Sequence, residues 1–532
     1  MGTRRLLLGA LAAAFLVGVP LAILVSRTYR QGRALAPGNG GVVIRFPGED
    51  WGRPTPFQFY PRGPGYIHMS YLFDTLVWKD EDGLEGLLAL AWEVSPDGLS
   101  YTFELRPGIR WHDGRRLTAR DVAFSADYLR RHRFGWTDME TIAGAEALDD
   151  LHVTLRLREP FAPFLNDVAG CFPVIPAHVW KDVEDPETFS GPASVTGSGP
   201  FRLEHYDKTQ GTYAYVANED YFLGPPKVDK IQYVACGDRL LSLRNGDIDA
   251  MLLFSRTLDA ADAFFDHPRL EILEGPGDWV LKIVFNHQRP ALGRAKTRRA
   301  LALAVDHEEI ARRIRHGHVL PGSPAFLPRT SPWRHPDIGG FETDLDEARR
   351  LLAEAGATGK RFTLLAAPDY VREAEYVADR AGEIGLSLTV KALAPSTLDA
   401  FLREGNFEIA IDGHGGLGGD PDVLRKQFCL SAPSGEGASV LRSGAFGYRN
   451  EALERLGEAQ RAEADPRKRR ALVFRMQEIL ARDLPSIALW HPRVYFVYDP
   501  AVFDGWFFTP GGIGIGIPLT ENKLAFVERR RP

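Results

Sequence analysis

The hydrophobic pattern of the chain changes near residue 280, and this change limits the possible folds more than any other feature. Before it, short segments of alternating apolar and polar residues lie between Pro/Gly turns, as at residues 99–105 (LSYTFEL), which indicates strands. After it, strand-like segments alternate with amphipathic helical segments, which is typical of a mixed α/β domain. Since 532 residues are too many for one hydrophobic core, we expect two or three domains.

Local signals place the individual elements. Thr118 and Asp121 are spaced as a capping pair at a helix N-terminus, and Gly246 is expected to end a helix. We expect strands at 42–46, 99–105, 152–157, 212–216, 231–234, 281–285, 361–366, 386–390, 487–490 and 494–497, and helices from 118 onwards and at 296–315, 345–355 and 467–482.

The N-terminus carries the signal of an exported protein. Arg4-Arg5 precede an uncharged, largely apolar run at 6–25, and three more arginines follow by residue 33. At about 1.5 Å per helical residue this run can span roughly 30 Å of hydrocarbon. Residues 1–33 are therefore expected to be a signal peptide or a retained membrane anchor, with a flexible tether at 34–41. The run lacks a cysteine near its end, which excludes the usual bacterial lipoprotein anchor.

Composition excludes several classes of function. The formal net charge is −6, and the arginines of the N-terminal segment make the remaining chain more acidic still, which argues against a nucleic-acid partner. Export allows one disulfide, for which Cys171 and Cys236 are the favoured pair, but three unpaired thiols including Cys429 are an equal alternative. The spacing of Cys and His does not fit a zinc site, so we expect neither a metal nor a cofactor.

Five ordered blocks of sequence resemble one known family. They are residues 72–93, 94–129 with Trp111-His112-Asp113-Gly114 and Leu117-Thr118-Ala119-Arg120-Asp121-Val122, 197–201 (GSGPF) with 218–221 and 243–250 downstream, 285–310, and 344–356. Together they resemble the extracellular solute-binding proteins, family 5, which serve peptide and nickel ABC importers.

The resemblance implies an α/β, two-lobed periplasmic-binding-protein-like fold of the large, three-subdomain type II variant. The first lobe would comprise 42–280 and 491–532, with an inserted subdomain at about 54–190, and the second lobe would be 281–490. It further implies a monomer that binds a small-molecule or oligopeptide ligand between the lobes, closes about a hinge, and delivers the ligand to permease subunits in the membrane.

The stretch 413–422 (GHGGLGGDPD) is the most informative candidate site. Its glycines allow a close approach of the backbone to a ligand, and the absence of a following Lys-Ser/Thr excludes a P-loop. In the peptide-binding members an Asp in this segment pairs with the ligand's α-amino group, and that position is Leu417 here. Free peptides should then bind poorly unless Asp420 or Asp412 substitutes. His414 lies in the same stretch and is a further candidate for ligand contact.

The family's cleft is lined with aromatic side chains, and three tryptophans are expected to face it here. Trp279 and Trp490 lie near the two expected hinge crossings, and Trp506 lies in the tail. Asn286 follows the strand expected at the first crossing and completes the candidate ligand-binding set.

Enzymatic interpretations fit the sequence less well. His112 beside Asp113, and Asp247 near Asp249, are better explained as turn and helix-end residues than as acid-base pairs. Gly197-Ser198-Gly199 is followed by Pro200 and does not form a nucleophile elbow. We expect transport of a peptide-like solute without catalysis. A non-peptide ligand (an oligosaccharide, an opine or a metal chelate), a membrane-tethered sensor and a secreted hydrolase are the alternatives.

Overall fold

The computed structural model describes residues 41–429, 445–514, 516–517 and 519–527. The predicted signal peptide or anchor, and all but the last residue of the predicted tether, lie outside these residues. Within the described part of the chain, no helix combines the length and the apolar character needed to cross a membrane.

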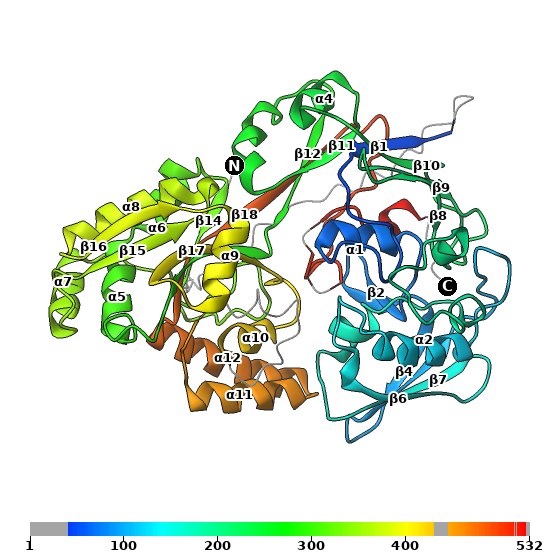
Figure 1. Ribbon diagram of the computed structural model, residues 1–532, viewed down its shortest axis with the longest axis horizontal. Coiled ribbons are helices and arrows are strands. Elements are labelled where there is room, and N and C mark those ends of the chain that lie inside the picture. Colours follow the sequence, from blue (N-terminus) through cyan, green and yellow to red (C-terminus); the bar gives the residue numbers. More distant parts are fainter. Residues whose placement is uncertain (1–40, 430–444, 515, 518, 528–532) are drawn as a thin grey trace, which may run out of the picture. The chain divides into compact units, whose positions relative to one another are not determined.

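The described residues form a mixed α/β structure (Figure 1). The helices are α1 Gly63–Ser70, α2 Ala119–Arg131, α3 Ala177–Trp180, α4 Arg239–Asn245, α5 Ala295–Ala304, α6 His307–Glu309, α7 Leu345–Glu354, α8 Val371–Glu383, α9 Pro395–Glu404, α10 Val423–Phe428, α11 Glu451–Ala462 and α12 Pro466–Asp483. The strands are β1 Val43–Pro47, β2 Val77–Lys79, β3 Leu84–Gly86, β4 Ala89–Val94, β5 Ser100–Leu105, β6 Ile142–Ala147, β7 His152–Leu157, β8 Phe201–Asp207, β9 Thr212–Ala217, β10 Lys230–Val234, β11 Ala250–Leu253, β12 Glu271–Pro276, β13 Trp279–Phe285, β14 Val319–Pro321, β15 Arg361–Ala366, β16 Ser387–Ala392, β17 Ile409–Gly415 and β18 Ser486–Tyr498.

Strand β18 joins two groups of strands into one eight-stranded sheet and is the long orange strand of Figure 1. Its C-terminal half pairs with β11 and β12, whereas its N-terminal half pairs with β13 and β14. The segment between β12 and β13 lies directly beside Pro492. The contact is so close that a Cβ atom at Gly277 would overlap the Pro492 carbonyl. Two adjacent backbone segments therefore link the two groups of strands.

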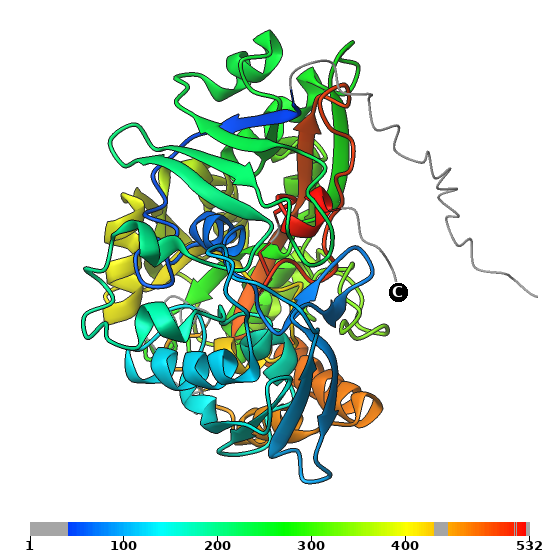
Figure 2. The same cartoon turned by 90° about the vertical axis from the view of Figure 1, so that its right-hand side faces the viewer.

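The smaller sheets belong to the first half of the chain. One has the order β1-β10-β9-β8, a second has the order β4-β5-β7-β6, and β2 pairs with β3. Helix α2 packs on β6 and β7, and it is the cyan helix beside that sheet in Figure 2. Its start follows from the sequence, because the Asp121 carboxylate accepts a hydrogen bond from the Thr118 N–H at 2.9 Å.

Two large hydrophobic cores divide the described residues. The first core draws its buried side chains from 44–250, together with Phe496 and residues 506–526. The second core draws them from 243–497, and smaller clusters around α10–α12 and around α9 lie beside it. The first core is thus discontinuous in sequence, because the C-terminal segment returns to it.

A buried ion pair fastens the C-terminal segment to the first core. The Lys523 Nζ atom lies 2.6 Å from the Asp74 Oδ1 atom, and both side chains are fully buried. Lys523 also lies 4.5 Å above the ring of Trp78, whose indole N–H donates to Asn522. Breaking such a pair leaves one buried charge uncompensated, so the returning segment is strongly held.

Most expected elements are confirmed to within a few residues, and two differ. The expected helix at 296–315 is interrupted after α5, because Val305 is extended and Asp306 caps a new helical turn by accepting from the Glu309 N–H. The two expected strands at 487–490 and 494–497 are one strand, β18. Pro492 is tolerated inside it at the point where β18 changes partners.

Candidate functional site

Three adjacent strands bring three of the predicted site residues to one place. In the pairing of β13 with β17, Trp279 lies opposite Gly415 and Val280 lies opposite His414. On the other side of β13, Leu281 lies opposite Trp490 of β18. This is the point of the large sheet nearest the two linking segments.

Trp279 is a half-buried aromatic surface at this point. Its ring packs on Gly413, where any Cβ atom would overlap the indole. The rings of Tyr370 and Phe254 lie 6.1 Å and 6.0 Å away. Phe254 follows β11, so this aromatic group includes side chains from both sides of the linking segments, as a ligand surface beside a hinge would.

Trp490 is buried beneath Trp279 and serves the second core. The two rings are 5.5 Å apart, and Trp490 is 1% exposed. Its indole N–H donates to Glu373 at 3.2 Å, and the Arg315 guanidinium, itself paired with Glu373, lies 5.2 Å from the ring. In this conformation Trp490 lies against Trp279 and is buried, and its contact with a ligand stays a prediction.

His414 belongs to a buried polar network. Its Nε2 atom lies 2.9 Å from the Gln427 amide nitrogen, so it accepts, and the ring proton is on Nδ1. The Gln427 carbonyl accepts from Lys282 at 3.1 Å, and Lys282 lies 4.0 Å from Asp412. Burial and the Lys282 charge hold the pKa of His414 well below its usual value, and burial lowers the pKa of Lys282 to about 8. His414, Gln427, Lys282 and Asp412 thus belong to one buried polar network.

The side chain of Leu417 is also buried in this conformation. It is 1% exposed and packs in the apolar cluster that contains Val280 and Leu424. Its backbone N–H donates to the carbonyl of Asp278 at 3.2 Å. The glycines around it approach a second glycine-rich segment, residues 509–517, which belongs to the C-terminal part of the chain.

We call the contact between these two segments the glycine seam, which consists of Gly416, Gly418 and Gly419 against Gly511 and Gly516. A Cβ atom at Gly516 would lie 2.9 Å from the Gly416 Cα atom, and one at Gly511 would lie 2.7 Å from the Gly418 carbonyl oxygen. Gly416 and Gly516 have φ angles of +81° and +92°, which favour glycine. At the glycine seam, backbone from the two halves of the molecule meets without intervening side chains.

Ion pairs next to the glycine seam join the same two halves. Lys426 of α10 lies 2.7 Å from Asp167, whose neighbours Val168 and Phe172 belong to the first core. Arg461 of α11 pairs with Glu159 at 2.5 Å, and its carbonyl accepts from the Ala162 N–H at 2.7 Å. The structure therefore describes the two halves in contact.

Asp420, proposed as a substitute for the missing Asp at 417, is already paired. Arg469 donates to both of its carboxylate oxygens, one at 2.7 Å, and both side chains are buried. The second candidate, Asp412, lies 4.0 Å from the buried ammonium of Lys282. Asp420 is thus bound within the protein.

A family model, described as "Bacterial extracellular solute-binding proteins, family 5 Middle", matches residues 83–436. The chain belongs to this family. The dipeptide-binding protein of Escherichia coli is 27% identical over 443 residues, which cover 77% of this chain and 81% of that protein. Heme-binding protein A of Haemophilus influenzae is 27% identical over 480 residues, which cover 81% and 84%.

A crystal structure of similar fold is that of the ABC transporter substrate-binding protein CtaP from Listeria monocytogenes. Its TM-score is 0.78 at 23% identity, and the match covers 92% of this chain and 99% of that one. The fold is therefore the two-lobed α/β fold expected from the sequence. Membership of the family makes this chain the extracytoplasmic substrate-binding component of an ABC transporter.

Two predicted residues of this solute-binding protein lie away from the others. The Asn286 side chain is 2% exposed and donates to the carbonyls of Gly405 and Phe407, both at 3.0 Å. Trp506 is buried in the first core, 4.6 Å from Phe496, where its indole N–H donates to the Phe503 carbonyl. Both side chains are used to hold backbone segments in place.

The structure also shows where the three cysteines and His112 lie. Cys171, Cys236 and Cys429 are all free thiols, so the favoured disulfide is wrong: Cys171 is buried beside Asn166 in the first core, whereas Cys236 follows β10. The described residues contain no group of three or more His, Cys, Asp or Glu arranged to hold a metal. His112 bonds to the backbone at positions 197 and 199, as a structural histidine.

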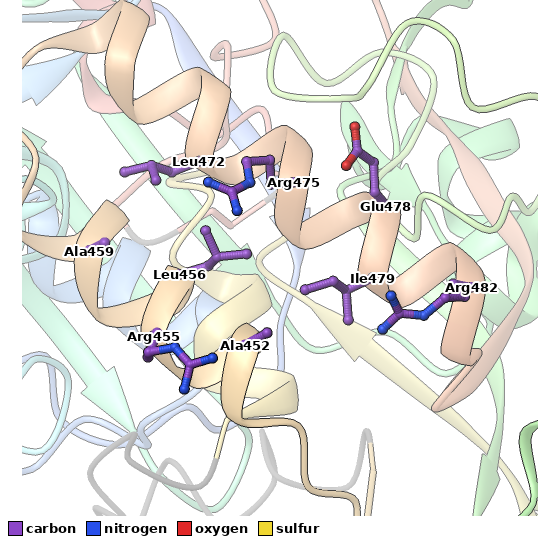
Figure 3. Close-up of a pocket in the computed structure, with 9 residues that line it drawn as sticks. All are labelled: Ala452, Arg455, Leu456, Ala459, Leu472, Arg475, Glu478, Ile479 and Arg482. Carbon is purple, nitrogen blue, oxygen red and sulfur yellow. The ribbon is translucent and has the colours of Figure 1, made fainter.

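A surface groove of about 530 Å³ lies between α11 and α12 (Figure 3). It is lined by Ala452, Arg455, Leu456, Ala459, Leu472, Arg475, Glu478, Ile479 and Arg482. None of the predicted ligand-binding residues lines it. The candidate site of this protein therefore remains the region around Trp279 and the glycine seam.

Proposed function

We propose that this protein captures a peptide-like solute outside the cytoplasmic membrane and delivers it to its permease by closing two lobes. The observation that carries the proposal is the arrangement around β18. Two adjacent backbone segments link the strands that pair with the two halves of β18, and the two halves of the molecule also meet at the glycine seam and through two ion pairs. Two bodies linked by short backbone segments can separate and close again.

The lobe boundaries follow the same arrangement. The first lobe would comprise 42–280 and 491–532, including the inserted subdomain at about 54–190, and the second would comprise 281–490. The change of partners along β18 and the packing of Gly277 on Pro492 support hinge crossings at these positions. We expect the protein to act as a monomer.

Peptide is the favoured ligand class because a relative over most of the chain is a dipeptide-binding protein. A relative of equal identity that is named for heme supports a non-peptide ligand as the alternative. The half-buried aromatic surface at Trp279 suits apolar side chains of a peptide and also a flat ring system.

The test is a binding screen with the purified protein, read out by thermal shift and by small-angle scattering. A ligand-induced rise in melting temperature together with a smaller radius of gyration is expected for peptides. Binding without compaction would contradict lobe closure, and binding of heme but no peptide would replace the ligand class. Turnover of a bound peptide would contradict a purely binding role.

The N-terminal segment 1–33 is proposed to direct export and to remain as a membrane anchor. The observation behind this is the length of the uncharged run at 6–25, which exceeds that of an ordinary signal-peptide core. Mass spectrometry of the protein from a membrane fraction tests it. An intact N-terminus is expected, and a soluble product that begins after residue 25 would contradict retention.

A further inference from the structure

The structure contains a buried carboxylate beside the glycine seam that was not evident from the sequence. Asp278 lies in the segment between β12 and β13, the first of the two linking segments. It is 4% exposed. Among the described residues its carboxylate has neither a hydrogen bond nor an ion pair, although its backbone carbonyl accepts from Leu417. A buried charge without a partner is unfavourable in the ligand-free protein.

The Asp278 carboxylate lies against the backbone of Gly418, in the glycine-rich stretch 413–422. A Cβ atom at Gly418 would overlap the Asp278 carboxyl group, so glycine at this position is needed for the carboxylate to lie where it does. The next residue is different: a Cβ atom at Gly419 would meet its nearest neighbours at 3.7 Å, an ordinary contact distance. Of these two glycines, only Gly418 contacts Asp278 so closely that a side chain would displace the carboxylate.

Lys79, at the end of β2, is the cation that acts on Asp278. Burial raises the pKa of Asp278 to about 7, and the charge of Lys79 opposes this shift. The Lys79 ammonium instead donates to the carbonyls of Gly512 and Gly514, at 3.1 Å and 2.8 Å, within the opposing glycine-rich segment. Lys79 thus bonds to the backbone of that segment, and the Asp278 carboxylate has no hydrogen bond from it.

We propose that Asp278 is the anionic anchor of the ligand site and pairs with an ammonium group of the solute. The proposal rests on the solute-binding function above and narrows it to ligands that carry a primary or secondary amine. A ligand cation supplies the partner that the described residues do not, and the gain from pairing a buried charge favours the liganded, closed form. The ligand reaches Asp278 when the glycine seam opens.

The test compares a pool of random tripeptides with the same pool after N-acetylation. Binding is measured by equilibrium dialysis and mass spectrometry for the wild type, D278N, G418A and the control G144A, a glycine of β6 where an added Cβ atom meets nothing within 4 Å. Wild type and G144A are expected to bind the free pool about a hundredfold or more tightly than the acetylated pool. D278N and G418A should bind both pools equally, at the weak level that wild type shows for the acetylated one.

Each other outcome is decisive. Continued preference of D278N for the free pool, or equal binding of both pools by wild type, overturns the role of Asp278 and leaves the transport function intact. Equal behaviour of G418A and G144A overturns the geometry on which the proposal rests. Absence of binding of either pool to wild type removes both the peptide function and this inference.

Proton release gives a second measurement that does not depend on a variant folding well. Pairing with a ligand cation should make Asp278 give up its proton, so tripeptide binding near pH 7 should release protons. Calorimetry in buffers of different ionisation enthalpy detects this release. Proton uptake, or equal release in D278N, would overturn the proposal.

Discussion

Buried carboxylates on the two sides of the glycine-rich stretch 413–422 differ in whether the protein supplies a partner for their charge. On the side of α10 and α12, the Asp420 carboxylate is paired with Arg469, and Asp422 is paired with Arg425 at 2.7 Å. On the side of the linking segment, Asp278 is equally buried and has no partner among the described residues. When a buried carboxylate is paired within the protein, its charge is compensated without a ligand. One that is buried without a partner is stabilised only when something else supplies the charge.

Breaking the paired side should give the largest effect. R469M leaves Asp420 buried and uncompensated, and we expect the free energy of unfolding to fall by about 3 kcal/mol. Denaturant unfolding at pH 8 measures it. R470M is the matched control, because Arg470 is exposed yet stacks on the same Trp333 ring, at 5.3 Å against 5.5 Å for Arg469. Equal losses in both variants would mean that stacking, and not the Asp420 pair, is what Arg469 contributes.

Removing the unpaired charge of Asp278 should raise the free energy of unfolding. D278N keeps the shape of the side chain and should raise the free energy of unfolding at pH 8 by about 2 kcal/mol, less than the full charge penalty because the amide is also buried. Burial raises the folded-state pKa of Asp278 to about 7, above the ordinary 3.8. The wild type therefore loses stability as the pH rises from about 4 to 7, and is level above that range.

The measurement for this prediction is unfolding of both proteins at several pH values. The advantage of D278N should disappear below about pH 4, where Asp278 is protonated in the folded and the unfolded state. Lys79 is the charged group that opposes the shift, and because both groups are buried, added salt should change the series little. A variant that is less stable than wild type at pH 8 would show that Asp278 has a structural role.

Much of the fold could be predicted from the sequence, and the reasons are local. Strands β5 and β7 are predicted almost to the residue because their alternating patterns are bounded by turns. The break after α5 was missed although a signal was present, since Asp306 is followed by Glu309 at the capping-box spacing. Pairing of β18 with two groups of strands is a tertiary property, so its two halves looked like separate strands.

The candidate site was only partly predictable for a similar reason. Trp279 and His414 were chosen from their place in the family pattern, and the structure brings them to adjacent strands. Asp278 has no local motif. Its environment is created by Gly418, which is far away in sequence, and its lack of a partner is visible only when the surrounding side chains are placed. The same holds for Leu417, whose side chain turns into an apolar cluster.

Ion pairs that cross between the two halves allow the comparison to be sharpened. K426M removes the partner of the largely buried Asp167, and we expect tripeptide affinity to fall about fivefold, by about 1 kcal/mol, because the closed form is weakened. E159Q, in the more exposed pair with Arg461, should change affinity less than twofold, or about 0.4 kcal/mol. Calorimetric titration measures both, and equal losses would contradict the dependence on burial.

The smallest effect, a constant protonation state, is expected at His414, whose Nε2 atom already accepts a hydrogen bond from Gln427. Because the Gln427 amide donates to Nε2, and because burial and Lys282 hold the pKa of His414 well below its usual value, the ring should stay neutral from pH 5 to 8. Its 15N signals should then remain constant and show the proton on Nδ1, with exposed His205 followed in the same spectra as a reference. A pH-dependent shift within this range would mean that His414 becomes a donor. The Gln427 amide would then have to turn its oxygen toward the ring, and Lys282 would lose the Gln427 carbonyl as its acceptor.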